Sequence, residues 1–137
     1  MAERSNSEST LRVLLMTMGL ITATPAIALV DAYALEWTYR VTDPDPMTLA
    51  LLQHRGMLQL LLGAALVWAA FHPPARFAAA IAAIVGKSTF LLLILPNPTI
   101  RGDLAPFSIV FDLLCIAALT GVAIRYARPR RTIGALA

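Results

Sequence analysis

The side chains with the most chemical potential in this sequence are polar groups embedded in long apolar runs. An ionised side chain near the centre of a membrane helix costs about 2.5 to 3.5 kcal/mol on insertion scales. Such groups are therefore retained where they are paired, hydrated or used for function. The candidate ligand-binding residues on this criterion are Asp31, His54, Arg55, Gln59, Lys87 and Asp112.

The composition points to a lipid environment. The chain has 137 residues, of which 58% are hydrophobic and 14% are charged, and its mean hydropathy is +0.72. A soluble domain carries about 25% charged residues. The low charged fraction and the high hydrophobic fraction of this chain exclude a disordered chain, a nucleic-acid-binding domain and most soluble enzymes. A single cysteine, Cys115, excludes an internal disulfide and a cysteine-based metal site.

Apolar runs that are long enough to cross a bilayer make up most of the chain. About 20 helical residues span a hydrocarbon core of roughly 30 Å, and no run shows the strict alternation of a barrel strand. We therefore predict an all-α fold, an integral membrane four-helix bundle that forms a single transmembrane domain over residues 1–137. The predicted helices cover residues 11–36, 47–71, 75–95 and 105–126.

Prolines mark the expected helix boundaries. Asp45 followed by Pro46 is typical of an N-cap and a first helical residue. Pro73 and Pro74 should end the second helix. Pro25 lies within the first run, where it frees the carbonyl of Ile21 and predicts a bend. Two nearby hydroxyls are candidates to satisfy that carbonyl: Thr22 and Thr24.

Basic residues predict the orientation of the bundle. Cytoplasmic flanks of membrane helices are enriched in Lys and Arg. The two expected outer loops carry only Arg40 and Arg101, beside acidic residues. Both termini are therefore predicted to be cytoplasmic in a multi-pass protein of the bacterial inner membrane. The expected inner side carries Arg4, Arg12, Arg76, Arg125, Arg128, Arg130 and Arg131.

One ionisable group from each predicted helix falls at a similar depth. At a rise of about 1.5 Å per residue, Asp31 and Asp112 lie roughly 9 Å below the outer edge. Arg55 and Lys87 lie roughly 13 Å below it. Adjacent helices joined by short loops favour the pairs Lys87–Asp112 and Asp31–Arg55. The crossed arrangement remains open at this stage.

The remaining polar residues predict a chamber near the outer surface. Gln59 follows Arg55 by four residues and so shares its helix face, whereas His54 points about 100° away from Arg55. The simplest alternative is that the charges only fix the packing of the helices. No catalytic residue and no metal site is predicted, and an enzyme that uses His54 as a general base is the least favoured interpretation.

Small residues recur at four-residue spacing, which lets helix backbones approach closely in lipid. The first explanation is packing within one chain, and the alternative is a contact with another membrane subunit or a second copy. The spacing occurs in the rows Gly19 and Ala23, Ala28 and Ala32, Ala65 and Ala69, Ala78, Ala82 and Gly86, and Ala117 and Gly121.

Short motifs give the chain a resemblance to a known group of membrane proteins. They are His54-Arg55-Gly56 at the start of the second helix, the Pro73-Pro74 turn and the Lys87-Ser88 step. In these features and in layout the chain resembles the small four-helix bacterial membrane proteins of the DoxX-like and related uncharacterised families. The resemblance implies a small hydrophobic or redox partner such as a quinone.

These features lead to two hypotheses about function. The first is a membrane protein whose outer chamber binds or transports a small amphipathic or anionic ligand, quinone-like or lipid-like. The second is a structural or accessory subunit of a larger membrane complex, in which the buried charges serve helix packing. The expected partners are membrane lipids, with other membrane subunits or a homo-oligomer as alternatives, and no nucleic acid. No cofactor is evident beyond a quinone or a lipid.

Overall fold

The computed structural model describes residues 2–102 and 106–127, and all regular structure in these residues is helical. This confirms the predicted all-α class. The elements are α1 (Ala2–Ala23), the 3₁₀ helix η1 (Thr24–Leu29), α2 (Ala34–Tyr39), α3 (Pro46–Phe71), the 3₁₀ helix η2 (Pro73–Ala75), α4 (Arg76–Ile94) and α5 (Pro106–Ala127). Four segments are long and apolar enough to cross a membrane: Asn6–Leu29, Pro46–Phe71, Pro73–Ile94 and Pro106–Ala127.

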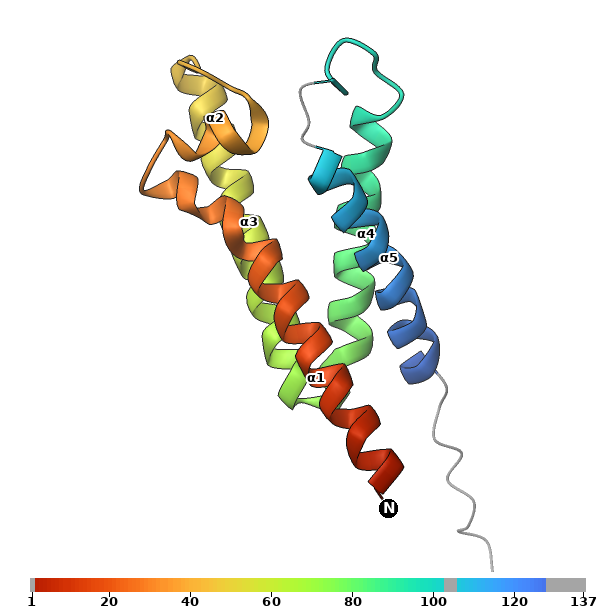
Figure 1. The fold of residues 1–137 in the computed structure, drawn as a ribbon. Coiled ribbons are helices and arrows are strands. Elements are labelled where there is room, and N and C mark those ends of the chain that lie inside the picture. Colours follow the sequence, from red (N-terminus) through yellow and green to blue (C-terminus); the bar gives the residue numbers. More distant parts are fainter. Residues whose placement is uncertain (1, 103–105, 128–137) are drawn as a thin grey trace, which may run out of the picture.

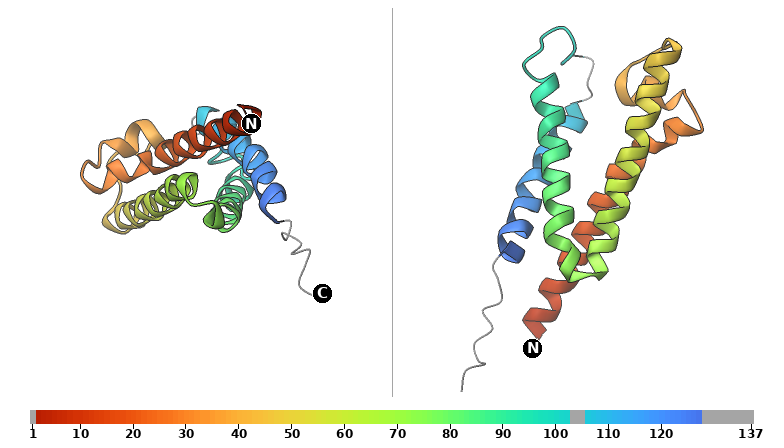
Figure 2. Two further views of the ribbon diagram at one scale, coloured as in Figure 1. Left: turned by 90° about the horizontal axis from the view of Figure 1, so that it is seen from below. Right: turned by 180° about the vertical axis from the view of Figure 1, so that it is seen from behind.

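The helices form two pairs. In Figure 1, α1 runs along α3 and α4 runs along α5, and the short η2 connects α3 to α4. We call the end at which α1 begins, α5 ends and η2 lies the turn end, and the opposite end, which holds α2, the loop end. At the turn end the two pairs lie close together, whereas toward the loop end they diverge (Figure 2).

Backbone contact between α1 and α3 depends on two glycines. A Cβ atom added to Gly19 would lie 2.6 Å from the carbonyl oxygen of Gly63, and one added to Gly63 would meet the carbonyl oxygen of Gly19. Ala23 packs on the same crossing, because its Cβ would lie 2.9 Å from a Cβ at Gly63. The Gly19 and Ala23 row thus serves packing within one chain, where close van der Waals contact stabilises helix pairs in lipid.

Pro25 ends the first α-helix and redirects the chain. The sequence predicts one helix over residues 11–36 with a bend at Pro25, but this extent is wrong, because α1 covers Ala2–Ala23 and tightens into η1, and α2 is a separate helix. Proline has no N–H to donate to Ile21, and the freed carbonyl instead accepts a hydrogen bond of 2.8 Å from the Thr24 hydroxyl, as predicted. Gly56 of α3 packs on this break, since a Cβ there would lie 2.8 Å from the Pro25 carbonyl oxygen.

Asp45 caps α3 as the sequence predicts. Its Oδ1 accepts hydrogen bonds from the backbone N–H groups of Met47 at 3.0 Å and Thr48 at 3.2 Å, and its Oδ2 accepts one from the Thr48 hydroxyl. The bond from the Thr48 side chain, followed by those from the backbone, holds the pKa of Asp45 below its ordinary value. The cap fixes where the membrane helix begins.

A proline pair at the end of α3 leaves two carbonyls without helical partners. The carbonyls of Ala69 and Ala70 would accept from residues 73 and 74, which are both prolines and lack an N–H. Arg76 supplies the missing donors: its Nε bonds the Ala69 oxygen at 3.0 Å and its Nη2 bonds the Ala70 oxygen at 2.9 Å. One side chain therefore satisfies both freed groups.

The same guanidinium joins all four long helices at the turn end. Arg76 is 1% exposed. It donates from Nη1 and Nη2 to the two carboxylate oxygens of Glu8 on α1, at 3.0 and 2.5 Å, and from Nη1 to the Tyr126 hydroxyl on α5 at 2.5 Å. We refer to Glu8, Arg76 and Tyr126 as the arginine clamp. From the sequence, Arg76 was expected only to contribute to the orientation of the bundle in the membrane.

Replacing Gly63 with alanine should separate α1 from α3. The added methyl group meets backbone on both sides, so the helices must move apart, and a loss of about 1 to 3 kcal/mol is expected. The matched control is Gly121→Ala, because a Cβ at Gly121 has no neighbour within 4 Å. Unfolding in a detergent titration measures both variants. Equal stability of the two variants would refute the backbone contact.

Replacing Arg76 with methionine should destabilise the fold by about 3 kcal/mol, because it strands Glu8 and two buried carbonyls. Arg12→Met is the matched control, since Arg12 also pairs with Glu8, but at 3.4 Å and with a side chain that is 48% exposed. Its loss should stay below about 1 kcal/mol. If Arg76→Met and Arg12→Met unfold at the same detergent fraction, the stabilising role of the arginine clamp is disproved.

Candidate functional site

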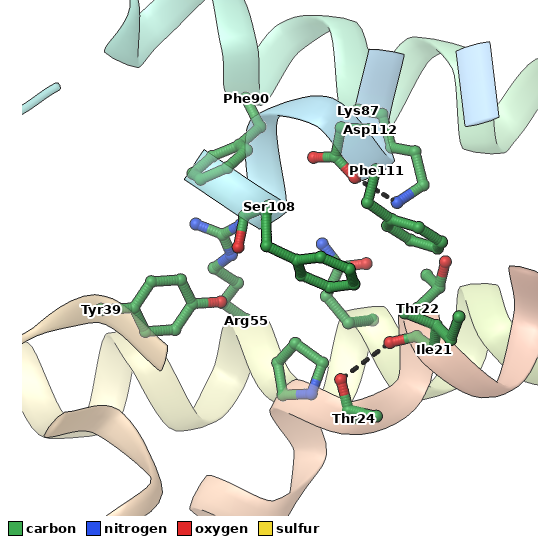
Figure 3. A pocket seen from close by; sticks show the side chains of 13 residues that line it. Ile21, Thr22, Thr24, Tyr39, Arg55, Lys87, Phe90, Ser108, Phe111 and Asp112 are labelled. Atoms are coloured by element: carbon green, nitrogen blue, oxygen red, sulfur yellow. Dashed lines mark hydrogen bonds and ion pairs between the residues drawn. The ribbon is translucent and has the colours of Figure 1, made fainter. Parts of the chain in front are cut away.

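A cavity of about 170 Å³ lies between the two helix pairs toward the loop end. Every long helix contributes to its wall, together with η1 and α2. Figure 3 shows side chains from these elements converging on one space. The lining residues are Ile21, Thr22, Thr24, Pro25, Tyr39, Arg55, Gln59, Lys87, Phe90, Phe107, Ser108, Phe111 and Asp112.

Lys87 and Asp112 form a buried ion pair across α4 and α5. The Lys87 Nζ lies 2.5 Å from the Asp112 Oδ1, and the two side chains are 4% and 12% exposed. The ammonium also lies 4.8 Å from the centre of the Phe111 ring. The predicted Lys87–Asp112 pair is therefore confirmed, and the crossed arrangement is excluded. Each charge is neutralised by the other, as burial in a low-dielectric medium requires.

Arg55 has a different environment. Its guanidinium carbon lies 3.8 Å from the centre of the Phe90 ring and 5.0 Å from that of Tyr39. Among the residues that the structure describes, no carboxylate lies within ion-pair distance of Arg55, and no acceptor receives a hydrogen bond from it. The aromatic faces stabilise the cation, but its N–H donors remain unused.

Two further polar groups on the cavity wall lack partners. The Thr22 hydroxyl and the Gln59 Oε1 are buried atoms without a hydrogen bond in the described part of the chain. Thr22 as a whole is only 3% exposed. A buried polar atom that makes no hydrogen bond costs free energy, about 1 to 3 kcal/mol. The wall therefore offers unused donors on Arg55 and an unused acceptor on Gln59.

Aromatic rings complete the wall. The rings of Phe107 and Phe111 stack with their centres 6.0 Å apart. The rings of Tyr39 and Phe90 lie next to the Arg55 guanidinium (Figure 3). Burial raises the pKa of the Tyr39 hydroxyl, while the nearby Arg55 cation opposes that shift. Tyr39 thus contributes a neutral phenol at physiological pH. The charged side chains on the cavity wall are those of Arg55, Lys87 and Asp112.

The structure does not bring Asp31 to the site. Asp31 is exposed in the turn after η1, where its carboxylate accepts the backbone N–H of Tyr33 at 3.0 Å. The expected Asp31–Arg55 pair is therefore wrong. The reason is the break at Pro25, which removes Asp31 from the face that a continuous helix would have presented to α3. Of the four charges expected at one level, the cavity gathers Arg55, Lys87 and Asp112.

The other predicted residues divide between the cavity and the surface. Gln59 lines the cavity, four residues from Arg55 on the same face of α3. His54 is exposed and does not line it. The aromatic residues of the wall were not predicted from the sequence, although Phe90 follows Lys87 by three residues and therefore shares its helix face.

Comparison of the chain with protein-family models, curated proteins and solved structures gives no match. The chemistry of the site is therefore derived from its own geometry.

The Lys87–Asp112 pair should behave as one unit. Asp112→Leu alone leaves a buried ammonium without a counterion and should cost about 3 kcal/mol or more. Combining Lys87→Met with Asp112→Leu removes both charges and should restore most of that loss, because a matched apolar pair requires no counterion. A double-mutant cycle in detergent measures the coupling. Simple addition of the two single losses would contradict a closed pair.

Proposed function

We propose that this chain is an integral membrane protein that crosses the bacterial inner membrane four times as a helical bundle, with both termini in the cytoplasm. Four apolar segments of sufficient length support the crossings. The excess of basic residues in the sequence at both termini and in the connection between the second and third spans supports a cytoplasmic location of these segments. In this orientation the cavity lies in the outer half of the bilayer.

We further propose that the cavity binds a small amphipathic ligand with an anionic or carbonyl-bearing head group, quinone-like or lipid-like. The observation that carries this proposal is the contrast between two cations on one wall. Lys87 is neutralised by Asp112 at 2.5 Å, whereas Arg55 faces aromatic rings and has no carboxylate partner among the described residues. An intramembrane cation without a protein counterion is best explained by a counterion or acceptor that comes from outside the chain.

The composition of the wall supports an amphipathic ligand. Aromatic side chains provide apolar contact area, and a few convergent polar groups fix orientation, which is the usual make-up of a small-molecule site. The helix pairs diverge toward the loop end, which supports entry of the ligand from the outer lipid leaflet in the proposed orientation. A ligand dissolved in the membrane therefore reaches the site without crossing water. Transport of the ligand remains part of the proposal.

A second candidate function is a structural or accessory subunit of a larger complex. The closed Lys87–Asp112 pair and the arginine clamp favour it, since both fasten helices to one another. This function does not account for Arg55, whose charge fastens nothing in the described residues. His54 lies outside the cavity, so a catalytic role for it has no support here, and the DoxX-like resemblance stays a prediction.

Arg55→Met should remove the ligand from the purified protein. Native mass spectrometry of the protein from its own membranes should show a bound small molecule on the wild type and at least a tenfold lower occupancy on the variant, because a charge-assisted hydrogen bond is lost. His54→Ala is the matched control, one residue away but outside the cavity, and should retain the ligand. Undiminished occupancy in Arg55→Met would reject the proposal.

A further inference from the structure

We infer that the head group held in this cavity is a single aromatic ring that carries a hydroxyl group, so that it donates one hydrogen bond and accepts another. This inference rests on the proposed function, namely that the cavity binds a small amphipathic ligand, and it replaces the anionic or carbonyl-bearing head group named there with a ring that carries a hydroxyl. It depends on three features of the wall: an acceptor without a partner, a hydroxyl without a partner, and the number of aromatic rings in relation to the cavity volume.

The orphaned acceptor sets the requirement for a donor. The Gln59 Oε1 is buried and receives no hydrogen bond from any described residue, and no water is available in a hydrocarbon core to supply one. A carboxylate, an ester or a quinone carbonyl only accepts, so each would satisfy Arg55 and leave Gln59 unpaired. A hydroxyl group satisfies both, since its hydrogen is donated to Gln59 and its oxygen accepts from Arg55.

Two positions on the helices make this bridging geometry accessible. Arg55 and Gln59 are separated by one helical turn on the same face of α3, which brings their side chains within the reach of one small polar group. The unpaired Thr22 hydroxyl lies on the facing wall, contributed by α1. It can donate to or accept from a second substituent, which would orient the ring.

The rings and the volume define the rest of the head group. Four aromatic side chains line the cavity, namely Tyr39, Phe90, Phe107 and Phe111, and planar rings pack favourably against such side chains in offset or edge-to-face geometry. The cavity of about 170 Å³ is close to the roughly 150 Å³ of an apolar cavity that admits benzene. It therefore accommodates one ring, and an attached alkyl chain must extend between the diverging helix pairs.

The test uses two probes that share a propyl-substituted ring and differ at the oxygen, where one carries a hydrogen that can be donated and the other carries a methyl group. In lipid nanodiscs, after removal of any co-purified ligand, 4-propylphenol and 4-propylanisole are titrated by calorimetry into the wild-type protein. Both can accept from Arg55, but only the phenol can donate to Gln59. The phenol should bind at least tenfold more tightly. Arg55→Met should weaken both probes.

Two substitutions locate the donor contact. Gln59→Leu should reduce the phenol-to-anisole ratio to near one, mainly by weakening the phenol. Gln59→Met, which keeps an unbranched side chain in the same space, should do the same if the branched variant does not fold. The control is Gln53→Leu, because the Gln53 amide instead donates to the Ala28 carbonyl at 3.1 Å and does not line the cavity. It should keep the wild-type ratio.

Each outcome separates this inference from the binding proposal. Equal affinity for the two probes, no binding of either, or a ratio unchanged by both Gln59 variants would overturn the hydroxyl donor. If a co-purified ligand still depends on Arg55 in that case, the binding proposal stands and only the nature of the head group is wrong. If no ligand and no probe depends on Arg55, both are overturned.

Discussion

A charge inside a hydrocarbon core must be paired, and this constraint determines how the four long helices are joined. Arg76 meets Glu8, Tyr126 and two carbonyls at the turn end, and Lys87 meets Asp112 farther along the molecule. The first contact holds the two helix pairs together, and the second holds α4 on α5. Between these contacts the packing is carried by small residues, above all Gly19 against Gly63.

Arg55 is an exception to this pairing, because it has no carboxylate partner among the described residues. It has the same access to the cavity as Lys87 and Asp112 but uses aromatic rings in place of a carboxylate. A network built for packing alone would have a second acid opposite Arg55, where the chain instead provides phenyl rings and uncharged polar groups. The wall therefore combines unused hydrogen-bonding capacity with an apolar surface, which is a property of binding sites rather than of helix contacts.

The sequence predicts the last three long helices, the N-cap of α3 and one ion pair, because each depends on local chemistry or on helices joined by a short connection. It does not predict the position of Asp31, since the extent of the turn after Pro25 depends on how η1 packs against Gly56. Part of the arginine clamp could have been predicted from the sequence. Two consecutive prolines after a helix leave two carbonyls without N–H donors, and Arg76 follows the second proline by two residues. Its partner Glu8 depends on tertiary contact and could not be read from local pattern.

The most direct test of this account is the side-chain Nε–H resonance of Arg55, observed by nuclear magnetic resonance in nanodiscs after removal of any ligand. A guanidinium stacked on Phe90 is predicted to resonate upfield, within the ring current, and to stay there when Asp31 is changed to asparagine or when Lys87 and Asp112 are replaced together by methionine and leucine. A downfield resonance that moves upfield in either variant would show that Arg55 is paired with a carboxylate of its own chain. That result would contradict an arginine that is free to receive a ligand.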